Sequence, residues 1–346
     1  MPARVVLFAL GGTIAMAGDA GVVPALSAAQ LVAAVPGLAD SGITVDVEDF
    51  RRVSGASLTF EDMAALSAAI EDRLDAGADG VVVTQGTDTI EETAYLLDLS
   101  HARPNPIVVT GAMRNPTLAG PDGPANLLAA VRTAASPTAA DLGVLVVFAD
   151  EIHAAARVRK THSTSGATFR SPDSGPLGHV VEGTPRFLAR PTHRSPLVRV
   201  DNPLPVEVPL VTMTLGDTGA TLAAIAGQVD GLVIAGFGAG HVPARAVEAL
   251  ADLAARVPVV LASRTGAGPV LARTYGFPGS ESDLLARGLI PAGFLDPLKA
   301  RVLLHQSLAA GHGHTAVRAV FATSDPIEGQ ASSTPMSNAA SVSRRE

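Results

Sequence analysis

Short runs of apolar, mostly β-branched residues alternate with longer amphipathic stretches along the first half of the chain. The short runs have the length and composition of strands buried on both faces, and they lie at residues 5–10, 43–47, 81–84, 107–110 and 144–148. Residues 60–74 and 124–134 instead place Leu, Ile and Ala at helical spacing, with Thr59 and Asp122 positioned as N-caps. This alternation predicts a mostly parallel sheet flanked by helices.

The second half repeats the alternation on a smaller scale after an irregular passage. From about residue 181 to 208 the chain is rich in proline and charge, which is typical of a connector. Strand-like runs follow at 210–215, 232–235 and 259–262, with helix-like runs at 220–228 and 244–255. We therefore predict a larger N-terminal α/β domain (1–185), a linker (186–208), a smaller C-terminal α/β domain (209–325) and a disordered tail (326–346).

Composition narrows the possible functions. The 346 residues carry a formal net charge of -8, and Lys and Arg are scattered rather than clustered, so nothing favours a nucleic-acid partner. No apolar run approaches the ~20 residues needed to cross a bilayer, and Gly11, Gly12 and Asp19 interrupt any signal-peptide pattern. We predict a cytoplasmic protein with no membrane partner. The absence of cysteine excludes thiolate catalysis and sulfur-ligated metals.

Two loops that follow predicted strands carry the candidate chemistry. The first strand ends in Gly11-Gly12-Thr13, which presents a hydroxyl after two glycines that allow close approach of the backbone to a ligand. Taken alone, this turn is more typical of an ordinary capped turn or a phosphate-binding loop. Thr13 is nevertheless a candidate nucleophile, because a second loop carries further hydroxyl and carboxylate groups that support a site.

That second loop is QGTDTIEET, which follows the run at 81–84 and is dense in hydroxyl and carboxylate groups. A capping box of Thr89 with Glu92 at the start of a helix explains part of this density. It leaves Thr87 and Asp88 on the ligand side, where Asp88 can bind an ammonium group. The loop therefore supports a binding or catalytic site.

Several segments, in this order, resemble the bacterial L-asparaginase family of threonine amidohydrolases. They are GGTIA after the first strand, TQGTDTIEET after a later one, VVTGAMR with DGPANL, RKT with ATFRSPDSGPLG, and LDPLKAR in the second domain. Together they extend over nearly the whole predicted folded chain. The resemblance implies the family's reaction, which is hydrolysis of L-asparagine to L-aspartate and ammonia.

The resemblance also implies the catalytic roles, residue by residue. It places the family's two threonines at Thr13 and Thr87, its acid at Asp88 and its lysine at Lys160. Thr13 attacks the amide carbon to form an acyl-enzyme, and water activated by the other three residues releases aspartate. Backbone N–H groups near Thr87 stabilise the negative charge on the amide oxygen. No metal or other cofactor is implied. Without the resemblance, the stretch RVRKTH favours a surface lysine.

The substrate is predicted to be a free amino acid held by several loops. Besides Thr87 and Asp88, the resemblance implies substrate contacts at Gly12, Gly86, Ala112 and Met113. The family's serine that holds the substrate α-carboxylate aligns with Gly55 here. We predict that Ser57, which flanks this position together with Ser54, takes its place, although backbone amides of the same loop can also bind a carboxylate.

Assembly is predicted to complete the site. The resemblance implies a homotetramer, or dimer of dimers, in which the smaller domain of a neighbouring subunit closes the site. Glu281 lies where the family places an acid that binds the substrate ammonium group from the adjacent subunit, although GSESDLL fits a helix-start glutamate equally well. His241, after GFGAG, occupies the place of a family asparagine, and its role stays open.

One departure from the family concerns a tyrosine in the loop after the first threonine. This chain has no side-chain hydroxyl between residues 16 and 26, and Val22 lies near the expected position. Of the chain's two tyrosines, Tyr95 lies on an apolar helical face typical of core packing. Tyr275 lies in a glycine-punctuated loop shortly before Glu281. We predict that Tyr275 supplies the missing phenol from the neighbouring subunit.

Two other functional classes compete with asparagine hydrolysis. An amidohydrolase that prefers glutamine would keep the same catalytic set, whereas the asparaginase-like subunit of a transfer-RNA amidotransferase is less favoured because no added domain precedes Gly11. A catalytically impaired amino-acid-binding or regulatory homologue is compatible with the missing loop tyrosine. Joint retention of Thr13, Thr87, Asp88 and Lys160 argues for an active enzyme.

Overall fold

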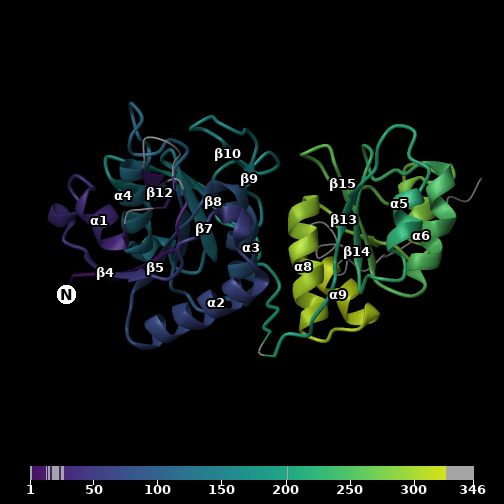
Figure 1. Ribbon diagram of the computed structural model, residues 1–346, viewed down its shortest axis with the longest axis horizontal. Coiled ribbons are helices and arrows are strands. Elements are labelled where there is room, and N and C mark those ends of the chain that lie inside the picture. The colour runs from purple at the N-terminus through teal and green to yellow at the C-terminus, as the bar shows by residue number, and fades with distance from the viewer. Residues whose placement is uncertain are drawn as a thin grey trace, which may run out of the picture.

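Two sheets of unequal size, each covered by helices, make up the molecule (Figure 1). The structure is a computed structural model and describes residues 2–12, 14, 16–17, 23–24, 27–200 and 202–324. The predicted tail, 326–346, lies outside the described residues. The predicted α/β architecture, with a larger and mostly parallel sheet first and a smaller α/β domain second, is confirmed.

The N-terminal sheet has eight strands in the order β12-β11-β8-β7-β6-β5-β1-β4. Its parallel part consists of β4 (Thr44–Asp49), β1 (Arg4–Ala9), β5 (Gly80–Thr84), β6 (Ile107–Thr110) and β7 (Val144–Phe148). Three antiparallel strands extend one edge: β8 (Glu151–Ala154), β11 (Gly178–Val181) and β12 (Thr184–Phe187). The sequence pattern does not predict this edge, because its strands are short and lack a continuous apolar run. β12 lies within the passage that we expect to be irregular.

Helices cover both faces of this sheet, and alternate side chains of each strand divide between the two faces. In β1, Val6 and Phe8 share a core with α2 (Phe60–Asp75) and α3 (Ile90–Ser100). Val5 and Leu7 share a second core with α1 (Ala28–Ala33) and α4 (Gly123–Ala134). Because both faces are covered, the central strands contain the uninterrupted apolar runs seen in the sequence.

Of the three helix caps predicted from the sequence, at Thr59, Asp122 and Thr89, only the one at α2 forms, whereas α7 (Glu281–Ala286) does begin at Glu281 as a helix-start glutamate would. Thr59 accepts a hydrogen bond from the N–H of Asp62, and the Asp62 carboxylate accepts one from the N–H of Thr59, so this cap is confirmed. Asp122 has near-helical backbone angles and turns its carboxylate to N–H groups of the loop after β6 instead. Thr89 makes no capping bond and donates its hydroxyl to the loop after β4, so the predicted box with Glu92 is wrong.

The C-terminal domain is built on a four-stranded parallel sheet. Its strands, in sheet order, are β13 (Leu210–Thr212), β14 (Leu232–Gly236), β15 (Val259–Ser263) and β16 (Ile290–Pro291). Its helices are α5 (Ala220–Ile225), α6 (Val247–Ala254), α7 (Glu281–Ala286), α8 (Pro297–Ala309) and α9 (His314–Ser324). The predicted strand at 210–215 ends at Thr212, and Leu215 is almost fully exposed.

The two domains share one hydrophobic core where α8 packs on α3. In Figure 1, α8 is the helix of the C-terminal domain that faces the N-terminal domain. Leu303 and Leu304 of α8 are fully buried in the same cluster as Ala94 and Leu97 of α3. Fully burying a leucine contributes roughly 1.5–3 kcal/mol relative to leaving it exposed. This contact therefore fixes α8, and the residues at its start, against the N-terminal domain.

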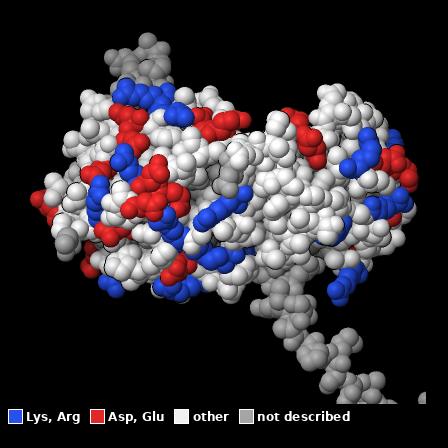
Figure 2. All heavy atoms as spheres, turned by 90° about the horizontal axis from the view of Figure 1, so that it is seen from below, with Lys and Arg blue, Asp and Glu red and all other residues white. Residues whose placement is uncertain are grey.

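Two short antiparallel pairs lie outside the main sheets: β2 (Met16–Ala17) with β3 (Val23–Pro24), and β9 (Arg159–Lys160) with β10 (Phe169–Arg170). No helix in the described part of the chain combines the length and apolar character needed to cross a bilayer. Figure 2 shows acidic and basic side chains interspersed over the face of the N-terminal domain seen from below, with no broad field of one sign.

Candidate functional site

Glycines at the carboxyl ends of three strands bring their loops into direct contact. A Cβ atom added to Gly12, after β1, would lie 2.1 Å from the backbone nitrogen of Gly86, after β5. A Cβ atom added to Gly55, after β4, would lie 2.8 Å from the carbonyl oxygen of Gly86. Gly12 also has φ +87°, in the left-handed region that favours glycine. The three loops therefore meet at the edge where an open parallel sheet binds its ligands.

Lys160, at the end of β9, joins this edge through its side chain. Its ammonium group donates to Thr87 Oγ1 and to Asp88 Oδ1, each at 3.0 Å. Thr87 is buried, the Lys160 side chain is 16% exposed and the Asp88 side chain is 62% exposed. The structure thus brings together three of the predicted catalytic residues, although 72 residues separate Asp88 from Lys160 in the sequence.

An amine held between a hydroxyl and a carboxylate is suited to proton transfer. When Lys160 is neutral, its nitrogen can accept the proton of the Thr87 hydroxyl, and when it is charged, the Asp88 carboxylate balances it. Such a set can activate an oxygen nucleophile and return the proton later. In the described ranges, no three His, Asp or Glu side chains are grouped so as to hold a metal ion.

The predicted nucleophile, Thr13, lies outside the described residues, and so does Val22. The residues on either side of Thr13 are described. Gly12 contacts the loop after β5, as above. Ile14 is buried and packs against Gly123 at the start of α4, in the same hydrophobic cluster as Ala112 of the loop after β6. The chain on both sides of position 13 is thus packed against the loops after β5 and β6.

The loop after β6 carries Ala112 and Met113 and lies against Thr87. A Cβ atom added to Gly111 would lie 3.5 Å from Thr87 Cγ2. Ala112 is fully buried, and the backbone N–H of Met113 donates to the carboxylate of Asp122. These contacts hold the loop at the same edge of the sheet as Lys160.

Ser57, the predicted carboxylate-binding residue, is exposed on the loop after β4. Its hydroxyl lies 3.1 Å from that of Ser54. Gly55, in the same turn, is buried and packs on Gly86, as described above. Ser57 therefore lies in a loop of the site, with a neighbouring hydroxyl as its partner.

The predicted residues of the C-terminal domain form a separate cluster. The Glu281 carboxylate, which is fully buried, accepts the backbone N–H groups of Thr274 at 2.9 Å and Tyr275 at 2.8 Å, and its other oxygen lies 3.2 Å from Nε2 of His241. Burial raises the pKa of Glu281, but these donors more than offset that effect and hold the pKa below its ordinary value. Glu281 thus fixes the loop that carries Tyr275.

Tyr275 itself is 44% exposed. Its ring meets His241 edge to face, with ring centroids 4.8 Å apart. Among the described residues, no hydrogen bond or ion pair links this cluster to Lys160 of the same chain. Tyr95, by contrast, is 1% exposed, which confirms its predicted place in the core.

One residue in direct contact with the site was missed by sequence reasoning. The Glu91 carboxylate, which is buried in the first turn of α3, accepts the backbone N–H of Lys160 at 3.1 Å. Acidic residues are common in the first turn of a helix, so its place in TDTIEET gave no distinct signal. Only its burial and its partner across the fold distinguish it.

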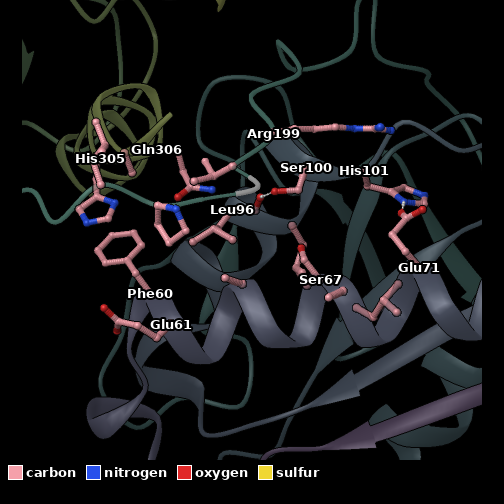
Figure 3. Close-up of a pocket in the computed structure, with 18 of the residues that line it drawn as sticks. Phe60, Glu61, Ser67, Glu71, Leu96, Ser100, His101, Arg199, His305 and Gln306 are labelled. Atoms are coloured by element: carbon pink, nitrogen blue, oxygen red, sulfur yellow. Dashed lines mark hydrogen bonds and ion pairs between the residues drawn. The ribbon is translucent and has the colours of Figure 1, made fainter. Parts of the chain in front are cut away.

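A cavity of about 570 Å³ lies elsewhere, between α2, α3, the inter-domain segment and α8 (Figure 3). There His305 stacks on Phe60, with ring centroids 3.5 Å apart. Burial, together with the charge of Arg301, lowers the pKa of His305 to about 4. None of the predicted site residues lines this cavity. The candidate site is therefore marked by converging polar groups rather than by cavity size.

Comparisons with known proteins show what the chain is similar to. The family model described as asparaginase, N-terminal, matches residues 4–193, and that of the glutaminase/asparaginase C-terminal domain matches residues 207–321. A probable L-asparaginase of Deinococcus radiodurans is 38% identical over 93% of this chain and 98% of its own. L-asparaginase 2 of Escherichia coli is 34% identical over 92% of both chains. A glutaminase-asparaginase of Pseudomonas aeruginosa is 35% identical over 87% of this chain and 84% of its own.

A solved structure is similar over the same length. The crystal structure of a probable cytoplasmic L-asparaginase from Campylobacter jejuni matches with a TM-score of 0.82 and 33% sequence identity. The match covers 92% of this chain and 99% of that one. Both domains are therefore included in the similarity.

Proposed function

The chain belongs to the asparaginase family, and we propose that it hydrolyses the side-chain amide of L-asparagine to give L-aspartate and ammonia. The observation that carries this proposal is the pair of 3.0 Å contacts from Lys160 Nζ to Thr87 Oγ1 and Asp88 Oδ1. Thr87 and Asp88 lie on the loop that Gly12 contacts, and Gly12 directly precedes the proposed nucleophile, Thr13.

The first half of the reaction transfers the acyl group to the enzyme. The hydroxyl oxygen of Thr13 forms a bond to the amide carbon of asparagine and gives up its proton. The resulting tetrahedral intermediate breaks its C–N bond, and the leaving nitrogen takes up the proton given up by Thr13 and departs as ammonia. An ester on Thr13 remains. Backbone N–H groups near Thr87 stabilise the oxyanion, an effect of roughly 2.7–4 kcal/mol for one such donor in other hydrolases.

The second half of the reaction restores the enzyme. Water adds to the ester carbon, and its proton passes through the Thr87 hydroxyl to Lys160. The C–O bond to Thr13 then breaks, the Thr13 oxygen takes the proton back from Lys160, and aspartate leaves. Asp88 balances the ammonium charge of Lys160 during this step. The sum is one asparagine and one water consumed for one aspartate and one ammonia.

The substrate is proposed to bind across the loops after β1, β4, β5 and β6. Gly12, Gly86, Ala112 and Met113 border the amide group, while Asp88 binds the α-ammonium group. Ser57 and the backbone of its turn bind the α-carboxylate. The contacts of Gly12 and Gly55 with Gly86, and of Gly111 with Thr87, place these four loops side by side and support this arrangement.

A neighbouring subunit is proposed to complete the site within a homotetramer. Tyr275, exposed on the C-terminal domain, supplies the phenol that the loop after Thr13 lacks. Glu281 is proposed to approach the substrate ammonium group from the same neighbour. Since its carboxylate is fully buried by Thr274, Tyr275 and His241 in the single chain, such contact requires that this loop open upon assembly.

The decisive experiment measures ammonia release from L-asparagine by the wild type and by Thr13→Ala. We expect turnover by the wild type and loss of roughly 10²- to 10⁴-fold or more in the variant, because a nucleophile has no substitute in this site. Equal rates would exclude Thr13 as the nucleophile. Binding of asparagine to the wild type by calorimetry, without any turnover, would instead support an amino-acid sensor.

Glutamine is a second candidate substrate, because the Pseudomonas aeruginosa relative is a glutaminase-asparaginase. Its side chain is one methylene longer, a difference worth about 1–3 kcal/mol in a pocket that discriminates by size. Initial rates of ammonia release, measured separately for the two amino acids at the same concentration well below KM, give the preference as the ratio of kcat/KM for glutamine to that for asparagine. A ratio above one for glutamine would reverse the proposed order.

A cytoplasmic location is also proposed. The similar Campylobacter jejuni protein is described as probably cytoplasmic, whereas a Haemophilus influenzae relative at 34% identity is described as periplasmic. Fractionation of the native organism, with cytoplasmic and periplasmic marker enzymes followed in parallel, decides between the two locations.

A further inference from the structure

Only two lysines, Lys160 and Lys299, occur in the chain, against 23 arginines. Both contact the same carboxylate. Oε1 of Glu91 accepts the backbone N–H of Lys160 at 3.1 Å, and Oε2 lies 3.4 Å from the ammonium nitrogen of Lys299. A chain that otherwise uses arginine for positive charge thus places each of its two lysines against Glu91.

Lys299 brings this contact from the other domain. It lies in the first turn of α8, its side chain is fully buried, and its ammonium also donates to Asp296 Oδ2 at 2.8 Å. Burial raises the pKa of Asp296, but the charge and hydrogen bonds of Lys299 and the charge of Arg159 more than offset that effect and leave the pKa below its ordinary value. Lys299 is therefore the cation between the buried carboxylate of Glu91 and the largely buried carboxylate of Asp296.

The third acceptor of Lys299 is the backbone carbonyl of Val158, two residues before Lys160. The ammonium thus holds the segment at Val158 directly, and through Glu91 it holds the segment again at the N–H of Lys160. Arg159 lies between these two points. One buried cation from the C-terminal domain therefore fixes both ends of a three-residue segment of the N-terminal domain.

This segment has little other support from regular structure. β9 consists of Arg159 and Lys160 alone, and it pairs only with the two residues of β10. The lysine side chain is a flexible four-carbon stem, so the position of its ammonium depends on where its backbone is held. A misplacement of about 1 Å at a catalytic group can cost on the order of 100-fold in rate.

Glu91 also belongs to the element that carries the partners of Lys160. Thr87 and Asp88 precede α3 directly, and Glu91 lies in its first turn. The bond from Glu91 to Lys160 N therefore sets β9 against the same helix start that presents Thr87 Oγ1 to Lys160 Nζ.

We propose that Glu91 is a positioning residue for the Lys160 amine and that Lys299, acting across the domain interface, holds Glu91 in place. The contact between the two domains then sets the alignment of Lys160 with Thr87. The kinetic part of this inference rests on the proposed amidohydrolase function, whereas its structural part does not.

The test uses two substitutions of similar size. Glu91→Met and Glu91→Gln both remove the charge, but only glutamine keeps an acceptor for the N–H of Lys160. Glu92→Gln is the matched control, since it removes the neighbouring carboxylate from the same helical turn without a hydrogen bond to Lys160. Where Glu91→Met fails to fold because Lys299 loses one of its two carboxylate partners, Glu91→Met with Lys299→Met replaces this ion pair by apolar side chains, a change that is often tolerated. Asp296 then keeps the backbone N–H groups of positions 298 and 299 as its donors.

The first readout does not depend on activity. Protein labelled with ¹⁵N only in lysine gives two backbone amide signals, and a spectrum of Lys299→Arg assigns them by loss of one. We expect the Lys160 signal to shift and to lose protection from hydrogen exchange in Glu91→Met. In Glu91→Gln and Glu92→Gln, the Lys160 signal should keep both its position and its protection from exchange. An unchanged, protected Lys160 signal in Glu91→Met overturns the proposal.

The second readout is turnover of L-asparagine. In Glu91→Met we expect kcat to fall on the order of 100-fold, with KM changed less than about threefold. In Glu91→Gln we expect kcat to be close to that of the wild type, because most of this loss is recovered. Equal kcat values in Glu91→Met and Glu92→Gln contradict the positioning role. If the wild type releases no ammonia, the proposed function fails, and the lysine amide signals still decide whether Glu91 holds Lys160.

Discussion

The backbones of Gly12 and Gly86 touch, because a Cβ atom at Gly12 would lie 2.1 Å from the nitrogen and 2.3 Å from the Cα of Gly86. The segment that leads to Thr13 and the loop that carries Thr87 are thus packed with no side chain between them. This contact explains sterically why glycine occupies these positions in GGTIA and TQGTDT.

Gly12→Ala is therefore expected to abolish activity and to destabilise the fold. A methyl group at this position must push the two loops apart, in addition to the roughly 1–2 kcal/mol that an L-residue loses in left-handed backbone. Gly77→Ala is the matched control, since Gly77 has φ +88° with nothing near its absent Cβ. Thermal unfolding and ammonia release of both variants measure the difference. Equal effects of the two substitutions would contradict the steric argument.

Lys160→Met is expected to lower kcat roughly 10²- to 10⁴-fold, the range for loss of a general acid–base group. The protein should remain folded, since the Lys160 ammonium makes its two bonds at a partly open edge. Lys160→Arg restores a positive charge beside Asp88, but a guanidinium does not give up a proton at physiological pH. Its kcat should therefore stay low. Full activity of Lys160→Arg would show that only the charge matters.

Removal of the Thr87 hydroxyl is expected to have an effect of the same order. Thr87→Val keeps the shape of the side chain and removes the partner of Lys160 Nζ, whereas Thr87→Ser keeps a hydroxyl and should retain much of kcat. Thr110→Val, at the end of β6, is the control, because that buried hydroxyl donates only to the carbonyl of Val147. It should cost about 1 kcal/mol of stability and little turnover.

Tyr275→Phe tests the phenol that is proposed to come from the neighbouring subunit. We expect a clear fall in kcat with unchanged folding, because the ring and its contact with His241 are kept. Co-assembly then identifies the subunit. In mixed oligomers of Thr13→Ala and Tyr275→Phe, some sites pair a native Thr13 with a native Tyr275 from the neighbour, so activity should reappear. Full activity of Tyr275→Phe alone would end this proposal.

A pH-dependent component of stability is expected from His305. The folded-state pKa is about 4, below the 6.5 of an unperturbed histidine, so the unfolded state binds the proton more readily between these values. Stability is therefore lost as the pH falls from about 6.5 to about 4. His305→Phe keeps the stack on Phe60 and removes the titrating group. Urea midpoints of the variant should fall less between pH 7 and pH 4.5 than those of the wild type, and parallel curves would exclude this contribution.

The sequence by itself determined the parallel strands and the kinds of functional group that make up the site. The parallel strands followed from continuous apolar runs, because burial on both faces leaves no room for polar alternation, and the hydroxyls and carboxylates at strand ends indicated a ligand edge. Thr87, Asp88 and Lys160 are brought together as the family resemblance implied. The antiparallel edge strands were missed, since four-residue strands with mixed polarity carry no clear period.

Tertiary structure alone decided which polar groups meet. Glu91 follows Thr87 by only four residues, yet its partners are Lys160 and Lys299, which lie far away in sequence and in two different domains. Local propensity explains an acid at a helix start equally well in solvent or in the core, so no pattern along the chain separates the two. Burial and partnership arise only when α8 packs on α3, because that contact excludes water from the carboxylate and leaves two lysine groups as its donors.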